Sequence, residues 1–376
     1  MRFLLNDEQR EFARSLDGML TAAGTPAVVR AWAAGDSAPG RALWARLAEA
    51  GVFALAVPEE HSGTGLLPVE LTVAFTELGR HAVPGPLVET VAAAAFLDRL
   101  GDEKAASEWL PAIASGASAV SFALLSPAGP AHGTVPGTVP GGAHGGAHGG
   151  AHGGAHGGAH GTPYALDADA ADAVFAVDGD SVRLARSAGA VQPSADPARR
   201  LARPLGGTVL AHGPAVTAAA EHAAHVARLA TAAQSLGLGR TLLARTVDHV
   251  RGRTQFGVAI GSFQAVKHHL ANTLIALEFA QPLVHSAALA LAAGDPAADR
   301  EIAAAKVAAG EAAHGAALTA LQLHGALGYT DELDLSLWIR KARPLRDAWG
   351  TPAVCRARVL AGLGAASAPA RTAVDE

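Results

Sequence analysis

The most regular pattern of chemically active residues is a set of five histidines spaced four apart, each ending a Gly-Gly-Ala-His unit: His144, His148, His152, His156 and His160. On a helix, imidazoles at this spacing would share one face and could chelate zinc or nickel. Each unit contains two glycines, however, and each glycine costs about 1 kcal/mol of helix propensity relative to alanine. We therefore interpret residues 133–161 as an expanded repeat in an exposed loop and expect no metal site there.

Two other stretches combine polar residues with glycine. They are Arg253-Thr-Gln-Phe-Gly257 and Gln322-Leu-His-Gly-Ala-Leu-Gly-Tyr-Thr330. A basic residue at a helix end stabilises the helix dipole by about 0.3–1 kcal/mol, and the glycines suit turns. The glycines after Gln322 do not form a dinucleotide fingerprint of the Rossmann type, because they follow a predicted helix and not a strand. These residues alone indicate a helical protein with glycine-rich loops between its helices.

Hydrophobic periodicity predicts which elements position these stretches. Residues 1–115 are predicted to form an N-terminal helical domain, 116–213 a middle β domain that includes the repeat, and 214–376 a C-terminal helical bundle. Helices are expected at 69–80, 87–100, 263–293, 297–323 and 351–363, and strands at 119–125 and 172–177. Residues 215–249 are predicted to form a long helix that breaks near Gly237 and Gly239.

Composition excludes several classes of protein. Hydrophobic residues make up 50% of the chain and charged residues 17%, so the chain is not disordered. The net charge of -5 gives no electrostatic case for binding nucleic acid. The single cysteine, Cys355, rules out a disulfide framework. We found neither a signal-peptide pattern nor an apolar run of the 18–20 residues that span a membrane, so we expect a cytoplasmic protein without membrane insertion.

Taken together, the glycine-containing stretches resemble the acyl-CoA dehydrogenase family. The pattern Arg-x-Gln-Phe-Gly-x-x-Ile-x-x-Phe-Gln spans residues 253–264, and Gln322 to Thr330 forms a second motif. The stretch Val57-Pro-Glu-Glu60, followed by two glycines, is similar to the family's N-terminal signature. The resemblance covers nearly the whole chain, and it implies an α+β fold in which a β-barrel-like domain lies between N-terminal helices and a C-terminal four-helix bundle.

The resemblance also implies a cofactor and the residues that hold it. Family members bind FAD at the junction of the domains, and the neighbouring subunit covers part of it. A guanidinium fork suits two phosphate oxygens, so Arg253 is the expected partner of the pyrophosphate. Gln322 and the backbone at His324 and Gly325 are expected to approach the dinucleotide from the adjacent subunit. The implied cofactor-binding residues are Arg253, Phe256, Gln264, Gln322, His324 and Gly325.

The catalytic base of the family is missing. The family reaction removes two hydrogens from adjacent carbons of an acyl thioester, and it needs a carboxylate to take the α-proton. In many members this is a glutamate just before Gly-Thr, where this chain has Trp349. In other members it lies on an earlier helix, at a position that matches roughly Ala227. Asp347 is the nearest carboxylate, but its place in the chain should point it elsewhere, so the base stays unassigned.

The residues that the resemblance places near the flavin ring also depart from the family pattern. Leu125 replaces the threonine whose hydroxyl normally reaches the flavin, within Leu124-Leu-Ser-Pro127. The segment that usually supplies an aromatic ring beside the flavin falls within the repeat, and Ala326 stands where a second glycine is common. The departures from the family pattern therefore lie among residues expected near the flavin ring and the substrate. The residues expected near the dinucleotide match the pattern more closely.

These observations leave several functions open. The preferred one is an FAD-dependent acyl-CoA dehydrogenase of fatty acid or lipid metabolism, acting as one subunit of a heteromer whose second chain supplies the base. An electron-transfer flavoprotein or similar acceptor would take the electrons, and the assembly would be a dimer or tetramer. The alternatives are a homo-oligomer with another base, a related flavin-dependent oxidase or hydroxylase, and a non-catalytic FAD-binding or scaffold homologue. The acyl chain of the substrate is not readable from the sequence.

Overall fold

The computed structural model describes residues 5–125 and 164–366, so the Gly-Gly-Ala-His repeat lies outside the described residues. The first part of the chain is helical, with α1 (Asp7–Ala22), α2 (Thr25–Ala33), α3 (Ala38–Glu49), α4 (Pro68–Arg80), α5 (Leu87–Leu100) and α6 (Glu103–Ala114). Short 3-10 helices η1 (Ala54–Ala56) and η2 (Glu59–His61) precede α4. The expected helices at 69–80 and 87–100 are confirmed as α4 and α5.

A small sheet follows the first helices. Strands β1 (Val120–Leu124), β3 (Ala173–Asp178), β4 (Ser181–Leu184) and β8 (Thr208–His212) pair in the order β1-β3-β4-β8. The β1–β3 pair is parallel, with Phe122 opposite Phe175, and the other two pairs are antiparallel. Two-stranded ladders are added by β2 (Ala165–Leu166) with β6 (Leu201–Ala202) and by β5 (Ser187–Ala188) with β7 (Pro204–Leu205).

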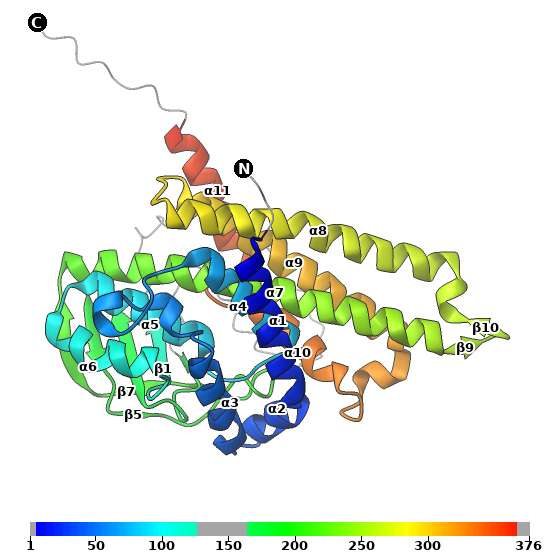
Figure 1. The fold of residues 1–376 in the computed structure, drawn as a ribbon, viewed down its shortest axis with the longest axis horizontal. Helices are drawn as coiled ribbons and strands as arrows, with labels where there is room; N and C mark the ends of the chain where they lie inside the picture. The colour runs from blue at the N-terminus through cyan, green and yellow to red at the C-terminus, as the bar shows by residue number, and fades with distance from the viewer. Residues whose placement is uncertain (1–4, 126–163, 367–376) are drawn as a thin grey trace, which may run out of the picture.

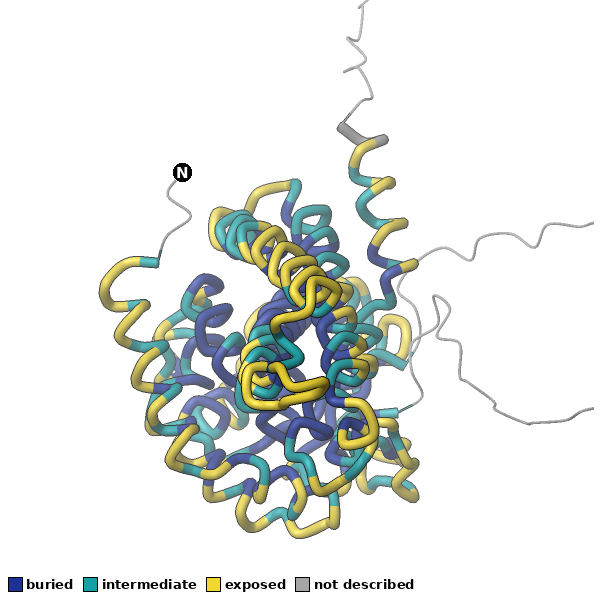
Figure 2. Tube along the Cα trace, turned by 90° about the vertical axis from the view of Figure 1, so that its right-hand side faces the viewer, coloured by how far each residue is buried: buried dark blue, intermediate teal, exposed yellow. Residues whose placement is uncertain are grey.

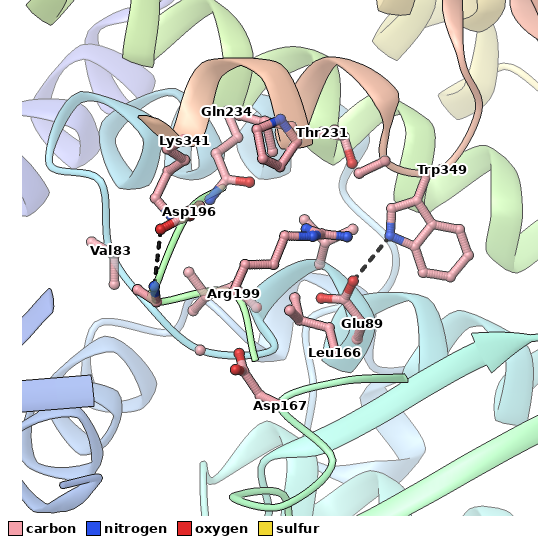
Figure 3. A pocket seen from close by; sticks show the side chains of 17 residues that line it. Val83, Glu89, Leu166, Asp167, Asp196, Arg199, Thr231, Gln234, Lys341 and Trp349 are labelled. Carbon is pink, nitrogen blue, oxygen red and sulfur yellow. Dashed lines mark hydrogen bonds and ion pairs between the residues drawn. The ribbon is translucent and has the colours of Figure 1, made fainter. Parts of the chain in front are cut away.

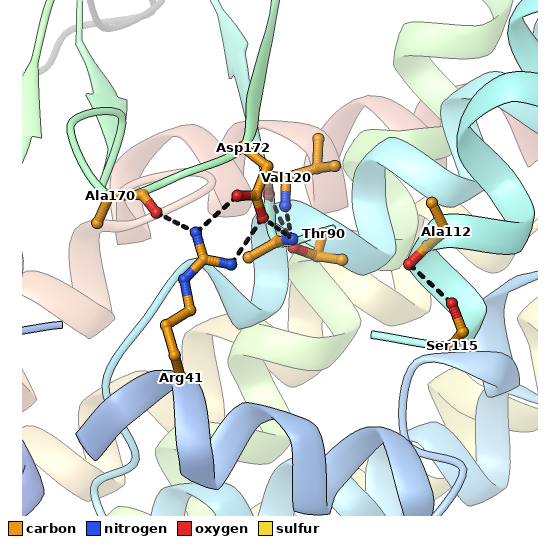
Figure 4. A network of polar contacts seen from close by, with 8 residues as sticks. Arg41, Thr90, Ala112, Ser115, Val120, Ala170 and Asp172 are labelled. Carbon is orange, nitrogen blue, oxygen red and sulfur yellow. Dashed lines mark hydrogen bonds and ion pairs between the residues drawn. The ribbon is translucent and has the colours of Figure 1, made fainter. Parts of the chain in front are cut away.

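Polar contacts tie this sheet to the helices before it (Figure 4). Arg41 of α3 donates to both carboxylate oxygens of Asp172, at 2.6 and 3.1 Å, and to the carbonyl of Ala170. Asp172 also accepts the backbone N–H of Ala119 at 2.7 Å. Within the core, the hydroxyl of Thr90 on α5 donates to the carbonyl of Val120 at 2.8 Å. The start of β1 is therefore held by two different helices.

The rest of the chain forms the helical bundle. It comprises α7 (Pro214–Gly252), the hairpin β9 (Thr254–Gln255) and β10 (Val258–Ala259), η3 (Ile260–Ser262), α8 (Gln264–Ala292), α9 (Ala298–His324), η4 (Gly325–Tyr329), α10 (Leu335–Asp347) and α11 (Pro352–Ala366). Figure 1 shows α7, α8 and α9 running side by side along the long axis, with the hairpin at the end far from the sheet. Figure 2, viewed toward that end, shows the loops there as largely exposed.

The predicted break in the first bundle helix is wrong, because α7 is continuous through Gly237 and Gly239. A Cβ on Gly237 would lie 1.8 Å from the carbonyl oxygen of Thr76 on α4, and one on Gly239 would lie 2.6 Å from Leu277 of α8. A Cβ on Gly79 of α4 would likewise lie 2.0 Å from the carbonyl oxygen of Gln234 on α7. These glycines are therefore sites of close helix packing and not breaks.

Helix α8 corrects one expectation from the sequence. By length and composition it is the one helix of the described chain that is apolar enough to cross a membrane. Leu277, Ala280 and Val284 are buried along the bundle, however, and Glu278 is exposed within the same stretch. The opposite face of the helix exposes Leu274, Ile275 and Phe279, the last at 73%. Helix α8 is thus a bundle helix with an uncovered apolar face.

Candidate functional site

A small polar cavity lies where α5, α7 and α10 meet the middle sheet region. Its volume is about 30 Å³, enough for one or two water molecules. Figure 3 shows charged and aromatic side chains that converge on it from four parts of the chain. We call it the junction cavity, and the residues that matter here are Glu89, Asp167, Asp196, Arg199, Lys341 and Trp349.

Trp349 occupies the position that matches the family base and forms one wall of the cavity. Its indole Nε1 donates to Oε1 of Glu89 at 3.2 Å, and its ring stacks on Phe122 of β1 at 6.1 Å between centroids. Its carbonyl accepts from Nε of Arg228 at 3.1 Å. The backbone φ of Trp349 is 57°, a left-handed conformation that bulky side chains rarely adopt. Several contacts therefore hold a strained residue in place.

Several buried charged groups line the cavity. Lys341 and Asp196 form a buried ion pair at 2.7 Å. Burial raises the pKa of Glu89, and it raises the pKa of Asp167 to about 7. Oε2 of Glu89 and Oδ2 of Asp167 have no hydrogen-bond partner among the described residues. Arg199 extends across the cavity, and its positive charge lowers the pKa of both acids against the effect of burial.

None of the base positions considered from the sequence carries a usable carboxylate here. Ala227 is fully buried within α7, and its carbonyl accepts the hydroxyl of Thr231, which lines the cavity. Asp347 ends α10 and lies outside the cavity lining, next to Arg346. Glu89 is the carboxylate nearest to Trp349, and the sequence analysis missed it. Its signal was a lone acid within the apolar run 87–97 of α5.

The residues expected to hold the cofactor lie at the other end of the bundle, away from the junction cavity. Arg253 caps α7, is exposed, and makes no side-chain hydrogen bond or ion pair within the described chain. Phe256 and Gly257 both have positive φ, at 54° and 79°, as a tight two-residue hairpin turn between β9 and β10 requires. This turn leaves Phe256 93% exposed, and Gln264 is exposed at the start of α8.

The second motif meets the first within this one chain. His324 ends α9, and its ring stacks on His249 of α7 with centroids 4.0 Å apart. His249 in turn accepts the backbone N–H of Arg253 through its carbonyl at 2.9 Å. Gln322 and Gly325 are exposed on either side of His324, and Gly325 has a φ of 59°. The two motifs therefore border one exposed surface, which we call the hairpin end.

The chemistry of the hairpin end fits an anionic dinucleotide. It presents the exposed guanidinium of Arg253 and exposed amides from Gln264 and Gln322. These groups donate hydrogen bonds that suit phosphate oxygens, and Phe256 offers an exposed aromatic face. The junction cavity offers neither comparable donors on a surface nor room for a ring system. The residues expected to bind the dinucleotide are thus brought together, whereas a place for the flavin ring is not formed beside Trp349.

Comparisons with known proteins agree with the sequence resemblance. The model of the acyl-CoA dehydrogenase N-terminal domain matches residues 6–117, and that of the C-terminal domain matches residues 217–364. Acyl-CoA dehydrogenase IpdE2 of Mycobacterium tuberculosis is 31% identical over 89% of this chain and 91% of that protein. IpdE2 of Mycolicibacterium smegmatis is 28% identical over 92% of this chain and 96% of that protein.

Solved structures share the fold along almost the whole chain. The ChsE4–ChsE5 complex of Mycobacterium tuberculosis aligns with a TM-score of 0.77 at 25% identity, over 98% of this chain and 100% of the matched chain. A glutaryl-coenzyme A dehydrogenase bound to glutaryl-CoA aligns with a TM-score of 0.77 at 20% identity, over 97% of each chain. The expected order of helices, sheet and helical bundle is confirmed.

Proposed function

The chain belongs to the acyl-CoA dehydrogenase family, and from this premise we propose that it is the non-catalytic subunit of a heteromeric, FAD-dependent acyl-CoA dehydrogenase. In this role it donates its hairpin end to a flavin site completed by a second, homologous chain. That second chain supplies the catalytic carboxylate and the pocket for the acyl thioester. The proposal includes a cytoplasmic location, which the lone buried Cys355 supports because the protein needs no disulfide.

The observation that carries the proposal is the small volume and charged lining of the junction cavity. Ligand pockets usually measure about 300–1,000 Å³, whereas this cavity measures about 30 Å³. Trp349 fills the base position, and the charged side chain of Arg199 extends across the cavity. Burying a hydrocarbon chain against these charges would strip them of solvation without replacing it. This chain is therefore unsuited to bind and oxidise an acyl thioester in its own pocket.

The hairpin end supports the second half of the proposal. Arg253 and Gln322 come from different motifs but border the same surface, so we assign them to one dinucleotide on the partner subunit. Arg253 would hold pyrophosphate oxygens with two guanidinium N–H groups. Gln264 and Gln322 would donate amide hydrogens to the same end of the cofactor, and the backbone at His324 and Gly325 would approach it closely. Phe256 would pack on the cofactor and exclude water from the phosphates.

The uncovered face of α8 supports an assembly of several chains. Leu274 and Ile275 are 47% and 51% exposed, and on the same helix Phe279 and Leu283 line a groove between α8 and α9. Apolar surface of this kind marks protein interfaces in soluble proteins. Of the known relatives, the ChsE4–ChsE5 structure is itself a complex of two different chains. A heteromer would cover α8 and complete the cofactor site at the same time.

The chemistry then divides between the subunits. FAD, when bound, would supply the acceptor for the β-hydrogen of the acyl group as hydride, and an electron-transfer flavoprotein or similar acceptor would take the electrons onward. In this scheme the α-proton would go to a carboxylate of the second chain, since neither Trp349 nor Ala227, at the positions that match the family base, carries one. The task of this chain is to orient the dinucleotide and to close the site against water.

Flavin counting tests the proposal. The chain is purified alone and after co-expression with a longer homologue that carries the glutamate, and FAD is measured per chain from visible absorption. We expect no flavin on the chain alone and about one FAD per heterodimer. One FAD per chain in the isolated protein would contradict the half-site and favour a homo-oligomer with another base. No flavin under either condition would leave a scaffold without a cofactor.

A further inference from the structure

Two histidines form a stack at the base of the hairpin end, and no step proposed above uses their rings. The imidazoles of His249 and His324 lie 4.0 Å apart with 25° between their planes. His249 is one helical turn before Arg253 on α7, and His324 is the last residue of α9 before Gly325. The stack is thus a side-chain contact between α7, which leads into Arg253, and α9, which carries Gln322.

The hydrogen bonds of the pair define its protonation. Nδ1 of His324 lies 2.8 Å from the carbonyl of Ala320, so it carries a proton and donates it there. His324 is 4% exposed, and Nε2 of His249 is buried without a partner in the described chain. The charged groups acting on His249 are Arg253 on its own helix and His324 on α9. No acidic group is among them, so nothing compensates a positive charge placed on the stack.

Two ring faces at this distance attract when both rings are neutral, because they share apolar contact. A proton on either ring places a cation in a poorly solvated site that already faces Arg253. Charging the second ring as well would oppose two cations about 4 Å apart. The contact is therefore stable as a neutral pair and is weakened by acid.

We propose that His249 is a positioning residue, and that its neutral stack on His324 holds the two motifs in the arrangement that binds the dinucleotide. The inference rests on the proposed function, since it assumes that the hairpin end holds FAD. It assigns no contact between His249 and the cofactor. Protonation of the pair separates α7 from α9 at this point and moves Arg253 away from Gln322, so flavin affinity falls at low pH.

The direction of the effect follows from the pKa of His249. Burial, then the charges of His324 and Arg253, hold this pKa below the ordinary value of 6.5. The ring is thus neutral at pH 7, and the folded protein resists its protonation. The stack's contribution is complete above about pH 6.5, where an unfolded histidine is also neutral, and it declines as the pH falls below that value.

The test is FAD affinity as a function of pH, measured by flavin fluorescence on whichever form retains cofactor, the chain alone or the heteromer. We expect wild type to bind more weakly at about pH 5.5 than at about pH 8, by up to about tenfold for one titrating ring. His249→Phe keeps an aromatic stack without a titrating nitrogen, so its affinity should match wild type at pH 8 and stay high at low pH. His249→Ala should bind weakly at both values.

Equal pH dependence in wild type and His249→Phe would overturn the inference and leave the proposed function standing. Wild type that binds FAD more tightly in acid would overturn it as well. Absence of flavin at pH 8 in every form would defeat the proposed function instead. In that case imidazole NMR of the isolated chain tests whether the stack forms. An ordinary pKa for His249 would refute the stack. A lowered pKa for His249 that rises to the ordinary value in His324→Ala would support it.

Discussion

Trp349 and Glu89 are 260 residues apart in sequence, yet the indole of one donates a hydrogen bond to the carboxyl of the other at 3.2 Å. The bond joins α5 of the N-terminal helices to the loop between α10 and α11. The indole stands at the position that the family resemblance assigns to the catalytic base, and its ring stacks on Phe122 of β1. All three parts of the chain therefore meet in one contact at the wall of the junction cavity.

This contact predicts how Trp349→Phe behaves. Phenylalanine keeps a ring against Phe122 but removes the indole N–H that donates to Oε1 of Glu89, and Oε2 of this buried carboxyl already has no partner among the described residues. We expect a loss of about 1–3 kcal/mol in the free energy of unfolding, measured by urea denaturation. Flavin content of the heteromer should not change, because the hairpin end is remote. Loss of flavin with normal stability would show that the cofactor contacts this chain's own junction cavity.

The helix crossing of α4 and α7 supplies a second prediction. Gly237→Ala would place a methyl group 1.8 Å from the carbonyl oxygen of Thr76. Relieving this overlap would require the backbone of α4 or α7 to move. We expect destabilisation of several kcal/mol, on the order of 3 or more, seen as a lower midpoint in chemical denaturation. Gly18→Ala on α1 is the matched control, because its Cβ meets nothing within 4 Å. That change should be neutral or stabilise the protein by up to about 1 kcal/mol.

Asp167 makes stability depend on pH. Its carboxyl has a pKa of about 7 in the fold against 3.8 when unfolded, mainly because it is buried. As the pH rises from 4 to 7, the unfolded chain releases this proton first, so this group lowers the stability of the folded state over that window. Asp167→Asn removes the effect and keeps an acceptor oxygen for Trp32, which now donates to Oδ1 at 3.1 Å.

The measurement is the difference in unfolding free energy between Asp167→Asn and wild type at pH 5 and at pH 8. We expect this difference to shift in favour of the variant by roughly 2–3 kcal/mol at the higher pH. Asp180→Asn, at an exposed position, should show no such shift. A constant difference across this range would mean that Asp167 is ionised in the fold at pH 5.

Arg253 provides a prediction for binding. Arg253→Ala should lower the FAD affinity of the heteromer by about 10- to 100-fold, since one charge-assisted, two-pronged contact to phosphate is worth about 1.5–3 kcal/mol. Arg251→Ala, on the exposed last turn of the same helix, controls for the general loss of positive charge. Equal losses of FAD affinity in the two variants, measured by flavin titration, would contradict a specific contact from Arg253. They would indicate a general electrostatic attraction instead.

Much of the fold was accessible from the sequence because it depends on local patterns. Helical periodicity predicted α4, α5, α8 and α9 to within a few residues, and the short apolar runs predicted β1 and β3. The motifs from Arg253 and from Gln322 indicated the family, which the relatives confirm. The missing carboxylate at Trp349 was equally visible, since the identity of a residue needs no structure.

What the sequence could not supply depends on contacts between distant segments. Glycine is found both at helix breaks and at tight helix crossings, so the residue type does not show which role Gly237 has. Only the close approach of α4 shows that it lies at a crossing. Glu89 gains its hydrogen bond and its raised pKa from residues that tertiary packing brings to it. Periodicity within a helix reports which face is buried, but it carries no information about the partner. The small junction cavity and the His249–His324 stack are therefore decided by the tertiary structure alone.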